Sequence, residues 1–283
     1  MYSYRGKTAL VTGASSGIGE AFARELAARG MQVILVARSA EKLRALAAEL
    51  TDRYDVRAEA IPADLSRDGA PQALYDETRR RGLAVDLLVN NAGFGAYGDF
   101  EAQEMAHDHE QVMLNVTAVV DLTHLFIPTL IERGGGGVIN IASTAAFQPV
   151  PYMPVYGASK SFVVTFSEAL WSEYRRKGVR VLALCPGPTR TAFFRVADNG
   201  QMQLGRLAQT PEQVVLNGLR GLERGRALVI SGVGNAIFAG LASLLPGTVV
   251  SYLGERVLRQ RTSQPAGAPL ANPLRQDMPA PTH

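Results

Sequence analysis

Short apolar runs alternate with longer amphipathic stretches along most of this chain, and this alternation constrains the fold more than any other feature. The runs have the length and near-continuous apolar character of strands buried on both faces. Strands are expected at residues 7–12, 32–37, 56–61, 86–89, 138–142, 179–184 and 227–230. Helices are expected at residues 17–29, 40–54, 68–81, 154–177 and 211–223, with further helical stretches up to about residue 133. This pattern predicts an α/β fold, a single doubly wound domain of about seven parallel strands with helices on both faces.

The predicted domain spans residues 1–261, and residues 234–261 form its apolar C-terminal part. Residues 227–254 contain no charged side chain, but glycines and Pro246 interrupt them, which leaves no continuous run of about 20 apolar residues. We expect two short apolar helices, at about 235–245 and 248–260, packed on the core or over a pocket. Contact with a membrane surface is the less favoured alternative. Residues 262–283 are rich in Pro, Ala and polar residues and are expected to be disordered.

The composition excludes several classes of protein. With 47% hydrophobic and 19% charged residues among 283, the chain can bury a sizeable core. The net charge of +3 is small and no basic block occurs, so nucleic-acid binding is not expected. A single cysteine, Cys185, excludes an internal disulfide, and His107 and His109 are expected at the surface, so no metal site is predicted. The N-terminus lacks the apolar segment of a secretory signal, so we expect a cytoplasmic protein.

Tyr156 and Lys160 are the strongest candidates for chemistry. A spacing of four residues places both side chains on one face of a helix. A free phenol has a pKa of about 10, and a fixed ammonium nearby favours the phenolate and lowers that value. The pair is therefore interpreted as a proton donor and acceptor for carbonyl and alcohol chemistry. Ser143 follows a predicted strand, and its hydroxyl can hydrogen-bond a carbonyl oxygen as negative charge develops there.

A glycine-rich segment, residues 12–19, joins the first predicted strand to the first predicted helix. Such a turn exposes backbone N–H groups and a positive helix end to a pyrophosphate. Gly13 permits the tight turn, Gly17 lets the backbone approach a phosphate, and Gly19 allows the helix to pack closely on the strand. The spacing is GxxxGxG, which differs from the usual GxGxxG of dinucleotide-binding folds.

Arg38 follows the second predicted strand, where a fold that binds NAD usually has an acidic residue. An arginine there can accept a 2′-phosphate, and Ser16, Ser39 and Lys42 can support it. NADP(H) is therefore the favoured cofactor, and the alternative is that Arg38 is a solvated loop residue.

Taken together, these residues resemble the short-chain dehydrogenase/reductase family over nearly all of residues 5–231. The matching motifs are residues 12–19, Asp64 with Leu65, residues 90–93, Asn115, Ser143, Tyr156 with Lys160, Pro186 with Gly187, and Thr191. Residues 30–31, 37–39 and 185–191 are more similar to a branch of bacterial reductases related to hydroxysteroid dehydrogenases and 3-oxoacyl-CoA reductases. The resemblance implies a Rossmann-type domain.

The resemblance also implies roles for individual residues. Asp64 would contact the adenine, Thr191 the nicotinamide carboxamide, and Lys160 the nicotinamide ribose, while Asn115 would hold a water that links Lys160 to solvent. The implied catalytic residues are Asn115, Ser143, Tyr156 and Lys160. The implied cofactor-binding residues are Gly13, Ser15, Ser16, Gly17, Ile18, Gly19, Arg38, Ser39, Asp64, Leu65, Asn91, Ala92, Gly93, Tyr156, Lys160, Pro186, Gly187, Thr189 and Thr191.

The expected function is an NADPH-dependent carbonyl reductase acting on a hydrophobic ketone or aldehyde, with Tyr156 as general acid. The residues expected around the substrate are mostly apolar, and they are Phe94, residues 144–153, Phe193 and Phe194, with only Arg190 and Arg195 as candidates for an anionic group. The alternatives are a hydroxysteroid or alcohol dehydrogenase working oxidatively, a non-catalytic NADP-binding regulator, and a lipid-associated scaffold. Apolar residues Phe162, Phe166, Ala169 and Leu170 on the helix at 154–177, together with the resemblance, predict a homodimer or homotetramer.

Overall fold

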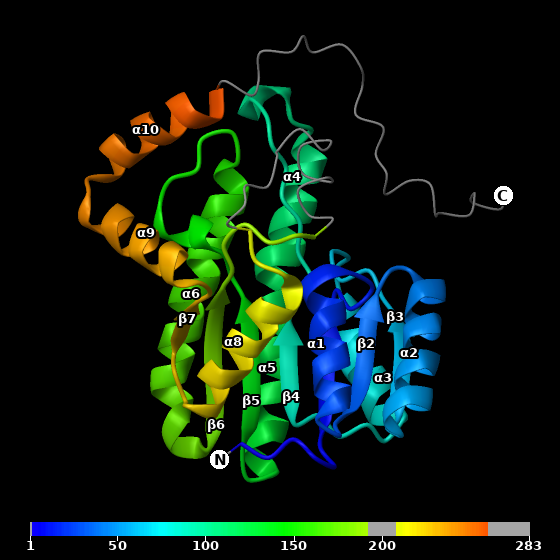
Figure 1. Ribbon diagram of the computed structural model, residues 1–283. Coiled ribbons are helices and arrows are strands. Elements are labelled where there is room, and N and C mark those ends of the chain that lie inside the picture. Colours follow the sequence, from blue (N-terminus) through cyan, green and yellow to red (C-terminus); the bar gives the residue numbers. More distant parts are fainter. Residues whose placement is uncertain (1, 192–207, 260–283) are drawn as a thin grey trace, which may run out of the picture.

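The computed structural model describes residues 2–191 and 208–259 and contains one seven-stranded parallel sheet. The strands are β1 (Thr8–Thr12), β2 (Gln32–Ala37), β3 (Ala58–Pro62), β4 (Leu87–Asn90), β5 (Gly136–Ile141), β6 (Val179–Cys185) and β7 (Leu228–Ile230). Their order is β3-β2-β1-β4-β5-β6-β7, and every neighbouring pair is parallel. The predicted fold class, a single Rossmann-type domain with about seven parallel strands, is confirmed (Figure 1).

Helices cover both faces of this sheet. They are α1 (Gly17–Ala28), α2 (Ala40–Tyr54), α3 (Ala70–Arg80), α4 (Met105–Val112), α5 (Ala118–Glu132), α6 (Pro154–Tyr174), α8 (Pro211–Glu223), α9 (Val233–Leu244) and α10 (Gly247–Arg259). A π-helical turn, Met113–Thr117, joins α4 to α5. The two apolar C-terminal helices expected from the sequence are present as α9 and α10. Phe193, Phe194, Arg195 and the tail at 262–283 lie outside the described residues.

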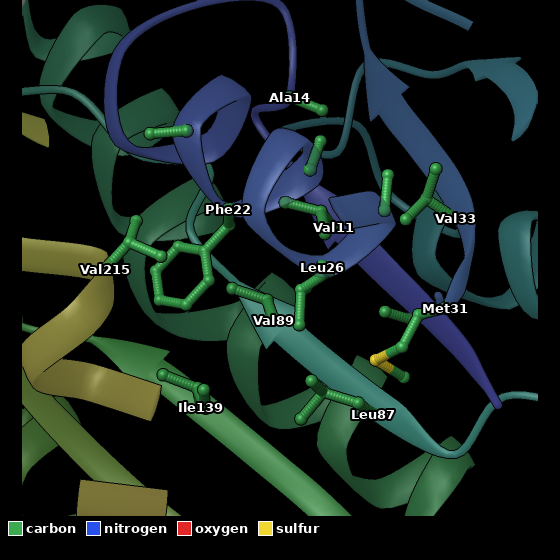
Figure 2. Packing of buried hydrophobic residues seen from close by; sticks show 14 of the residues in the cluster. Val11, Ala14, Phe22, Leu26, Met31, Val33, Leu87, Val89, Ile139 and Val215 are labelled. Carbon is green, nitrogen blue, oxygen red and sulfur yellow. The ribbon is translucent and has the colours of Figure 1, made fainter. Parts of the chain in front are cut away.

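Alternate strand residues supply a hydrophobic core on each face of the sheet. On one face, Phe22 and Leu26 of α1 pack on Val11, Val89 and their neighbours, with α2 and α8 beside them (Figure 2). On the other face, Leu10 and Val138 belong to the core that is shared with α3 and α5. Because successive side chains of a strand point to opposite faces, both cores need apolar residues, which explains the near-continuous apolar runs.

One helical run has the length and composition of a membrane span. It covers Met105–Glu132, which is 28 residues and includes α4, the π-helical turn and α5. However, α5 buries Leu122, Phe126 and Leu130 in the domain core. We therefore interpret this run as a core helix of the domain.

A glycine run such as residues 134–137 is typical of a turn, but only its first half lies outside the sheet. Gly136 and Gly137 are the first residues of β5, paired with Val179 and Leu87 respectively. A β-carbon at Gly136 would lie 2.7 Å from the Asp86 carbonyl oxygen, so the strand enters the sheet where only glycine fits. Glycine signals a turn in sequence, but here close packing requires it.

The order of the strands fixes where a ligand binds. Connections leave the sheet in opposite directions from β1 and β4, which are neighbours in space. In doubly wound folds the crevice beyond the carboxyl ends of such strands is the binding site. The glycine-rich segment follows β1, and the segment from Asn91 to Gly93 follows β4, so both border this crevice.

The close packing of the start of α1 against the turn after β1 depends on Gly19. A β-carbon there would lie 2.2 Å from the Gly13 carbonyl oxygen and 2.5 Å from Asn91 Nδ2. Gly19→Ala should therefore lower the free energy of unfolding by about 3 kcal/mol, measured by urea denaturation. As a control, Gly240→Ala in α9 has no atom within 4 Å and should leave stability unchanged or raise it by up to about 1 kcal/mol. Equal stability of the two variants would contradict the packing argument.

Candidate active site

Ser143, Tyr156 and Lys160 come together at the carboxyl end of β5. Ser143 lies two residues beyond the strand, and Tyr156 and Lys160 lie on the first turns of α6. The Ser143 hydroxyl hydrogen-bonds the Tyr156 phenol, and the Lys160 Nζ lies 5.7 Å from the centre of the Tyr156 ring. The helical spacing predicted from the sequence therefore places phenol, hydroxyl and ammonium in one cluster.

Lys160 is buried and is held by the backbone of β5. Its Nζ donates a hydrogen bond to the Ile141 carbonyl oxygen at 2.9 Å. Ser143 Oγ accepts a hydrogen bond from the Ala145 N–H at 3.1 Å, which leaves the hydroxyl proton of Ser143 to donate. These two bonds orient the ammonium and the hydroxyl before any substrate arrives.

Burial dominates the protonation of the cluster. It raises the pKa of Tyr156 to about 12, although the hydrogen bond from Ser143 acts in the opposite direction. Burial also lowers the pKa of Lys160 to about 8. The ammonium was expected to lower the pKa of the phenol, but the net shift is upward, because desolvation of the phenolate outweighs the hydrogen bond from Ser143. Both groups are mostly protonated at neutral pH.

Asn115 lies in the π-helical turn between α4 and α5 and is fully buried. Its Nδ2 donates to the Phe94 carbonyl at 2.9 Å and to Ser159 Oγ at 3.2 Å, and its Oδ1 accepts from the Phe94 N–H at 3.1 Å. A π-turn interrupts the regular hydrogen-bond ladder and is frequent at functional sites. Asn115 thereby fixes the loop after β4 against α6, and its role with a water stays a prediction.

Ser159 was missed by the sequence reasoning. Its Oγ donates to the Tyr156 carbonyl oxygen at 2.8 Å and accepts from Asn115, so it links the tyrosine turn to the π-turn. The sequence feature that could have identified Ser159 is its position between Tyr156 and Lys160. A small hydroxyl residue at a buried position there indicated a hydrogen-bond partner nearby.

The start of α1 has the properties of a phosphate site. The Ser16 side chain occupies the N-cap position without capping the helix, so it leaves the first backbone N–H groups to another acceptor. Gly17 has φ +60, and a β-carbon there would lie 3.2 Å from the Thr191 Cγ2, so Thr191 faces the glycine-rich turn. Gly13, Ser15 and Ile18 belong to this same turn.

Thr12 joins the two sides of the crevice and was not among the predicted site residues. Its Oγ1 accepts hydrogen bonds from the N–H groups of Asn91 and Ala92, both at 2.9 Å. Asn91 Nδ2 in turn donates to the Thr12 carbonyl at 2.9 Å. A β-carbon at Gly93 would lie 2.9 Å from Asn115 Oδ1, so this position also borders the catalytic cluster.

Arg38, Asp64 and Glu110 meet beyond the ends of β2 and β3. Arg38 is exposed, and its guanidinium lies 3.9 Å from a carboxylate oxygen of Glu110 on α4. Ser66 Oγ donates a hydrogen bond to Asp64 at 2.7 Å. Burial opposes ionisation of Asp64, but the hydrogen bonds from Ser66 and the positive charge of Arg38 hold the pKa of Asp64 below its usual range. Leu65 is buried beside Asp64. Ser39 stands at the N-cap of α2 without capping it. Glu110 was not expected here.

The segment after β6 closes the other side of the crevice. The Pro186 carbonyl accepts from the Thr144 N–H at 2.9 Å, which ties it to the residue after Ser143. Thr189 Oγ1 donates to the Gly187 carbonyl at 2.9 Å, and the Thr191 N–H donates to the Thr189 carbonyl at 2.8 Å. The predicted cofactor-binding residues thus follow the carboxyl ends of β1, β2, β3, β4 and β6, except Tyr156 and Lys160, which lie on α6 beside the end of β5.

α10 packs against the loop between Ser143 and Tyr156 and against Tyr97. A β-carbon at Gly254 would lie 3.5 Å from Pro151 Cδ, and the Tyr97 hydroxyl donates to the Leu258 carbonyl at 2.9 Å. Figure 1 shows α10 beyond the carboxyl edge of the sheet, above the loop that leads into α6. Tyr152 in this loop has φ 64, an uncommon conformation for a non-glycine residue, and its ring lies 5.8 Å from that of Tyr97. His107 packs on Phe94, with ring centres 4.9 Å apart.

These residues fit a nicotinamide dinucleotide. The uncapped start of α1 and the close-packed glycines leave room and donors for a pyrophosphate. Asp64 and Arg38 stand where the adenosine half would lie, and Thr191 and Lys160 where the nicotinamide half would lie.

Comparison with known proteins agrees with this geometry. The family model described as "short chain dehydrogenase" matches residues 7–201. A "Very-long-chain 3-oxoacyl-CoA reductase" from Anas platyrhynchos is 38% identical over 198 residues, which is 68% of this chain and 62% of that protein. The chain therefore spans less than two thirds of the length of this curated relative.

Two solved structures are also similar. A short-chain dehydrogenase from Sphingobium yanoikuyae in complex with NADPH has a TM-score of 0.76 and 31% identity, covering 93% of this chain and 98% of that one. A bulky-bulky ketone specific alcohol dehydrogenase from Comamonas testosteroni has a TM-score of 0.72 and 31% identity, covering 85% and 95%. With its fold, its crevice and its Ser-Tyr-Lys cluster, this chain belongs to the short-chain dehydrogenase/reductase family of oxidoreductases.

Proposed function

We propose that this protein is an NADPH-dependent carbonyl reductase that converts a hydrophobic ketone or aldehyde to the alcohol. One observation carries the proposal: the Tyr156 phenol is hydrogen-bonded to Ser143 and lies beside the buried Lys160 ammonium at the carboxyl edge of the sheet. This arrangement provides a proton donor, a hydrogen-bond donor and a positive charge for a carbonyl oxygen that becomes an alkoxide.

The reaction uses these residues as follows. The reduced nicotinamide, when bound, supplies a hydride to the carbonyl carbon. As that C–H bond forms, the C=O π pair moves to the oxygen, where the Ser143 hydroxyl donates a hydrogen bond. Tyr156 transfers its proton to the same oxygen and completes the alcohol. Lys160 stabilises the resulting phenolate until a proton returns from solvent. The same residues run the reverse oxidation.

Arg38 supports the preference for NADP(H). It lies at the end of β2, where an acidic residue would repel a 2′-phosphate. Glu110 already faces it at 3.9 Å, and Asp64 also lies near, so a bound phosphate would share Arg38 with these carboxylates. A phosphate monoester carries about −1.5 to −2 charges at neutral pH, more than a single carboxylate, which favours the phosphate in this competition.

The surroundings of Ser143 support a hydrophobic substrate. The loop between Ser143 and Tyr156 is mainly apolar and contacts α10, and no acidic or basic residue occurs within it. The solved relative named for bulky ketones and the curated relative named for very-long-chain 3-oxoacyl groups agree with a large apolar substrate.

Tyr156→Phe tests the assignment of the general acid. Removal of the hydroxyl should lower kcat with NADPH and a reactive ketone by at least about a hundredfold, because only the transferable proton is lost. Binding of NADPH, measured by fluorescence titration, should change little. Tyr75→Phe on α3, which removes a hydroxyl remote from the cluster, is the matched control and should keep full activity. Retention of most of the kcat by Tyr156→Phe would show that another group donates the proton.

The pH dependence should report Lys160. Burial lowers its pKa to about 8, so the ammonium loses its proton, and its positive charge, as the pH rises through that value. We therefore expect kcat/KM for NADPH to fall above about pH 8 with unit slope. Tyr156 has a pKa of about 12 and stays protonated throughout this range, so the fall is not due to the phenol. A profile that stays flat to about pH 9.5 would contradict this.

Two substitutions test the cofactor preference from opposite sides. Arg38→Ala should reduce the ratio of NADPH to NADH affinity by about 10- to 100-fold, because a charge-assisted phosphate contact is lost. Glu110→Gln should strengthen NADPH binding by a few-fold and leave NADH unchanged, because it removes the carboxylate that competes for Arg38. Arg53→Ala at the far end of α2 controls for net charge. Isothermal titration calorimetry measures all four proteins, and equal affinity of the unmutated protein for both cofactors would refute the preference.

A further inference from the structure

Bulky apolar side chains cover the outer face of α9 and α10. Leu244 has 81% of its surface exposed, Val233 79% and Leu241 59%. The exposed apolar residues on these helices and between them, which we call the outer face, are Val233, Ile237, Phe238, Leu241, Leu244, Leu245, Val249, Tyr252 and Leu253. Contiguous exposed apolar surface of this kind marks an interaction site.

The arrangement within α9 is the reverse of that in an ordinary amphipathic helix. Its buried residues are the small Ala239 and Ala242, whereas its large residues point outward. A helix that needed only to cover the domain would turn Ile237 and Leu241 inward. The small residues let α9 lie close to the domain, so that the large ones form the outermost surface.

The outer face presents few hydrogen-bonding groups to a partner. Residues 227–254 carry no charged side chain. The two polar side chains in α9 are already used, since Asn235 donates to the Ser231 carbonyl at 2.7 Å and Ser243 to the Ala239 carbonyl at 2.9 Å. Specific protein interfaces carry about one hydrogen bond per 100–200 Å². This face therefore suits an apolar medium better than a second protein surface.

Basic residues stand at one end of the outer face. Arg256 and Arg259 lie in the last turn of α10, and the Arg256 guanidinium lies 4.9 Å from the centre of the Tyr252 ring. Arg259 forms an ion pair with Glu255 at 3.4 Å, so these two arginines and one glutamate leave a net charge of +1 at this end of the helix. Arginine and tyrosine side chains at the border of an apolar surface are suited to the headgroup region of a lipid bilayer. The positive charge of arginine also complements anionic headgroups.

We propose that the outer face of α9 and α10 docks on the surface of an anionic lipid bilayer. Its apolar side chains enter the boundary of the acyl chains, and Arg256 and Arg259 contact the headgroups. Neither helix spans the bilayer, because α9 and α10 have only 12 and 13 residues and Pro246 separates them. The tail at 262–283 is not the occupant, because its sequence has no apolar periodicity.

The docked orientation places the site near the lipid. α10 contacts Pro151, which lies in the loop between Ser143 and Tyr156, and Tyr97. A substrate dissolved in the bilayer would therefore meet the site from the side of α10. The docking itself does not depend on the proposed reductase activity.

Flotation of the full-length protein with vesicles tests the docking. One set of vesicles is phosphatidylcholine alone, and the other contains phosphatidylserine as well. The unmutated protein should float with the mixed vesicles, and Leu241→Glu/Leu244→Glu should reduce the bound fraction by about tenfold, because charge in the outer face opposes its burial. Arg256→Gln/Arg259→Gln should weaken binding to the mixed vesicles only.

The control is Ala45→Glu/Ala48→Glu on the exposed face of α2. It adds the same charge at the same spacing, far from α9 and α10 (Figure 1), and should float like the unmutated protein. Circular dichroism verifies that each variant folds, and Phe238→Trp should show a blue-shifted emission with vesicles. Absence of flotation, or equal loss in the α2 control, overturns the proposal. Loss of self-association in Leu241→Glu/Leu244→Glu without any flotation would assign the face to a second copy of the chain instead.

Discussion

The hydrogen bond from the buried Lys160 ammonium to the Ile141 carbonyl is the contact on which the site depends. It joins α6 to the end of β5 at 2.9 Å and so sets where the first turn of α6, with Tyr156, stands relative to Ser143. Burying an ammonium is unfavourable unless it is hydrogen-bonded, and the lowered pKa of Lys160 expresses that penalty. A charge held in this way is available at neutral pH but poorly shielded by water, so it acts strongly on a phenolate formed beside it.

A second set of polar contacts extends from this bond across the sheet. Thr12 holds the loop after β4, and Asn115 holds Phe94 of the same loop and Ser159 of α6. Asn90 Nδ2 donates to Asn140 Oδ1 at 2.9 Å, which links β4 to β5 beneath the site. The catalytic edge is therefore positioned by side-chain hydrogen bonds between buried strand ends, in addition to the sheet ladder.

Much of this could be predicted from the sequence because local signals and the fold agree. The apolar runs specify parallel strands, and the spacing of Tyr156 and Lys160 specifies a shared helix face. What could not be predicted depends on contacts between distant segments. The entry of Gly136 into β5 follows from the position of Asp86, the π-turn at Asn115 from Phe94 and Ser159, and the raised pKa of Tyr156 from burial. The carboxylate of Glu110 beside Arg38 is likewise a tertiary contact between α4 and the end of β2.

The proposed reaction is hydride transfer from NADPH to a carbonyl carbon, with the proton from Tyr156. The most direct measurement is incubation of the protein with NADPH deuterated on the transferring face of C4 and a bulky hydrophobic ketone, followed by mass spectrometry and NMR of the product. We expect an alcohol with a single deuterium, located on the carbinol carbon, and no labelled product from Tyr156→Phe beyond trace amounts. An alcohol without deuterium, or no turnover of any ketone or aldehyde by a protein that binds NADPH, would contradict it.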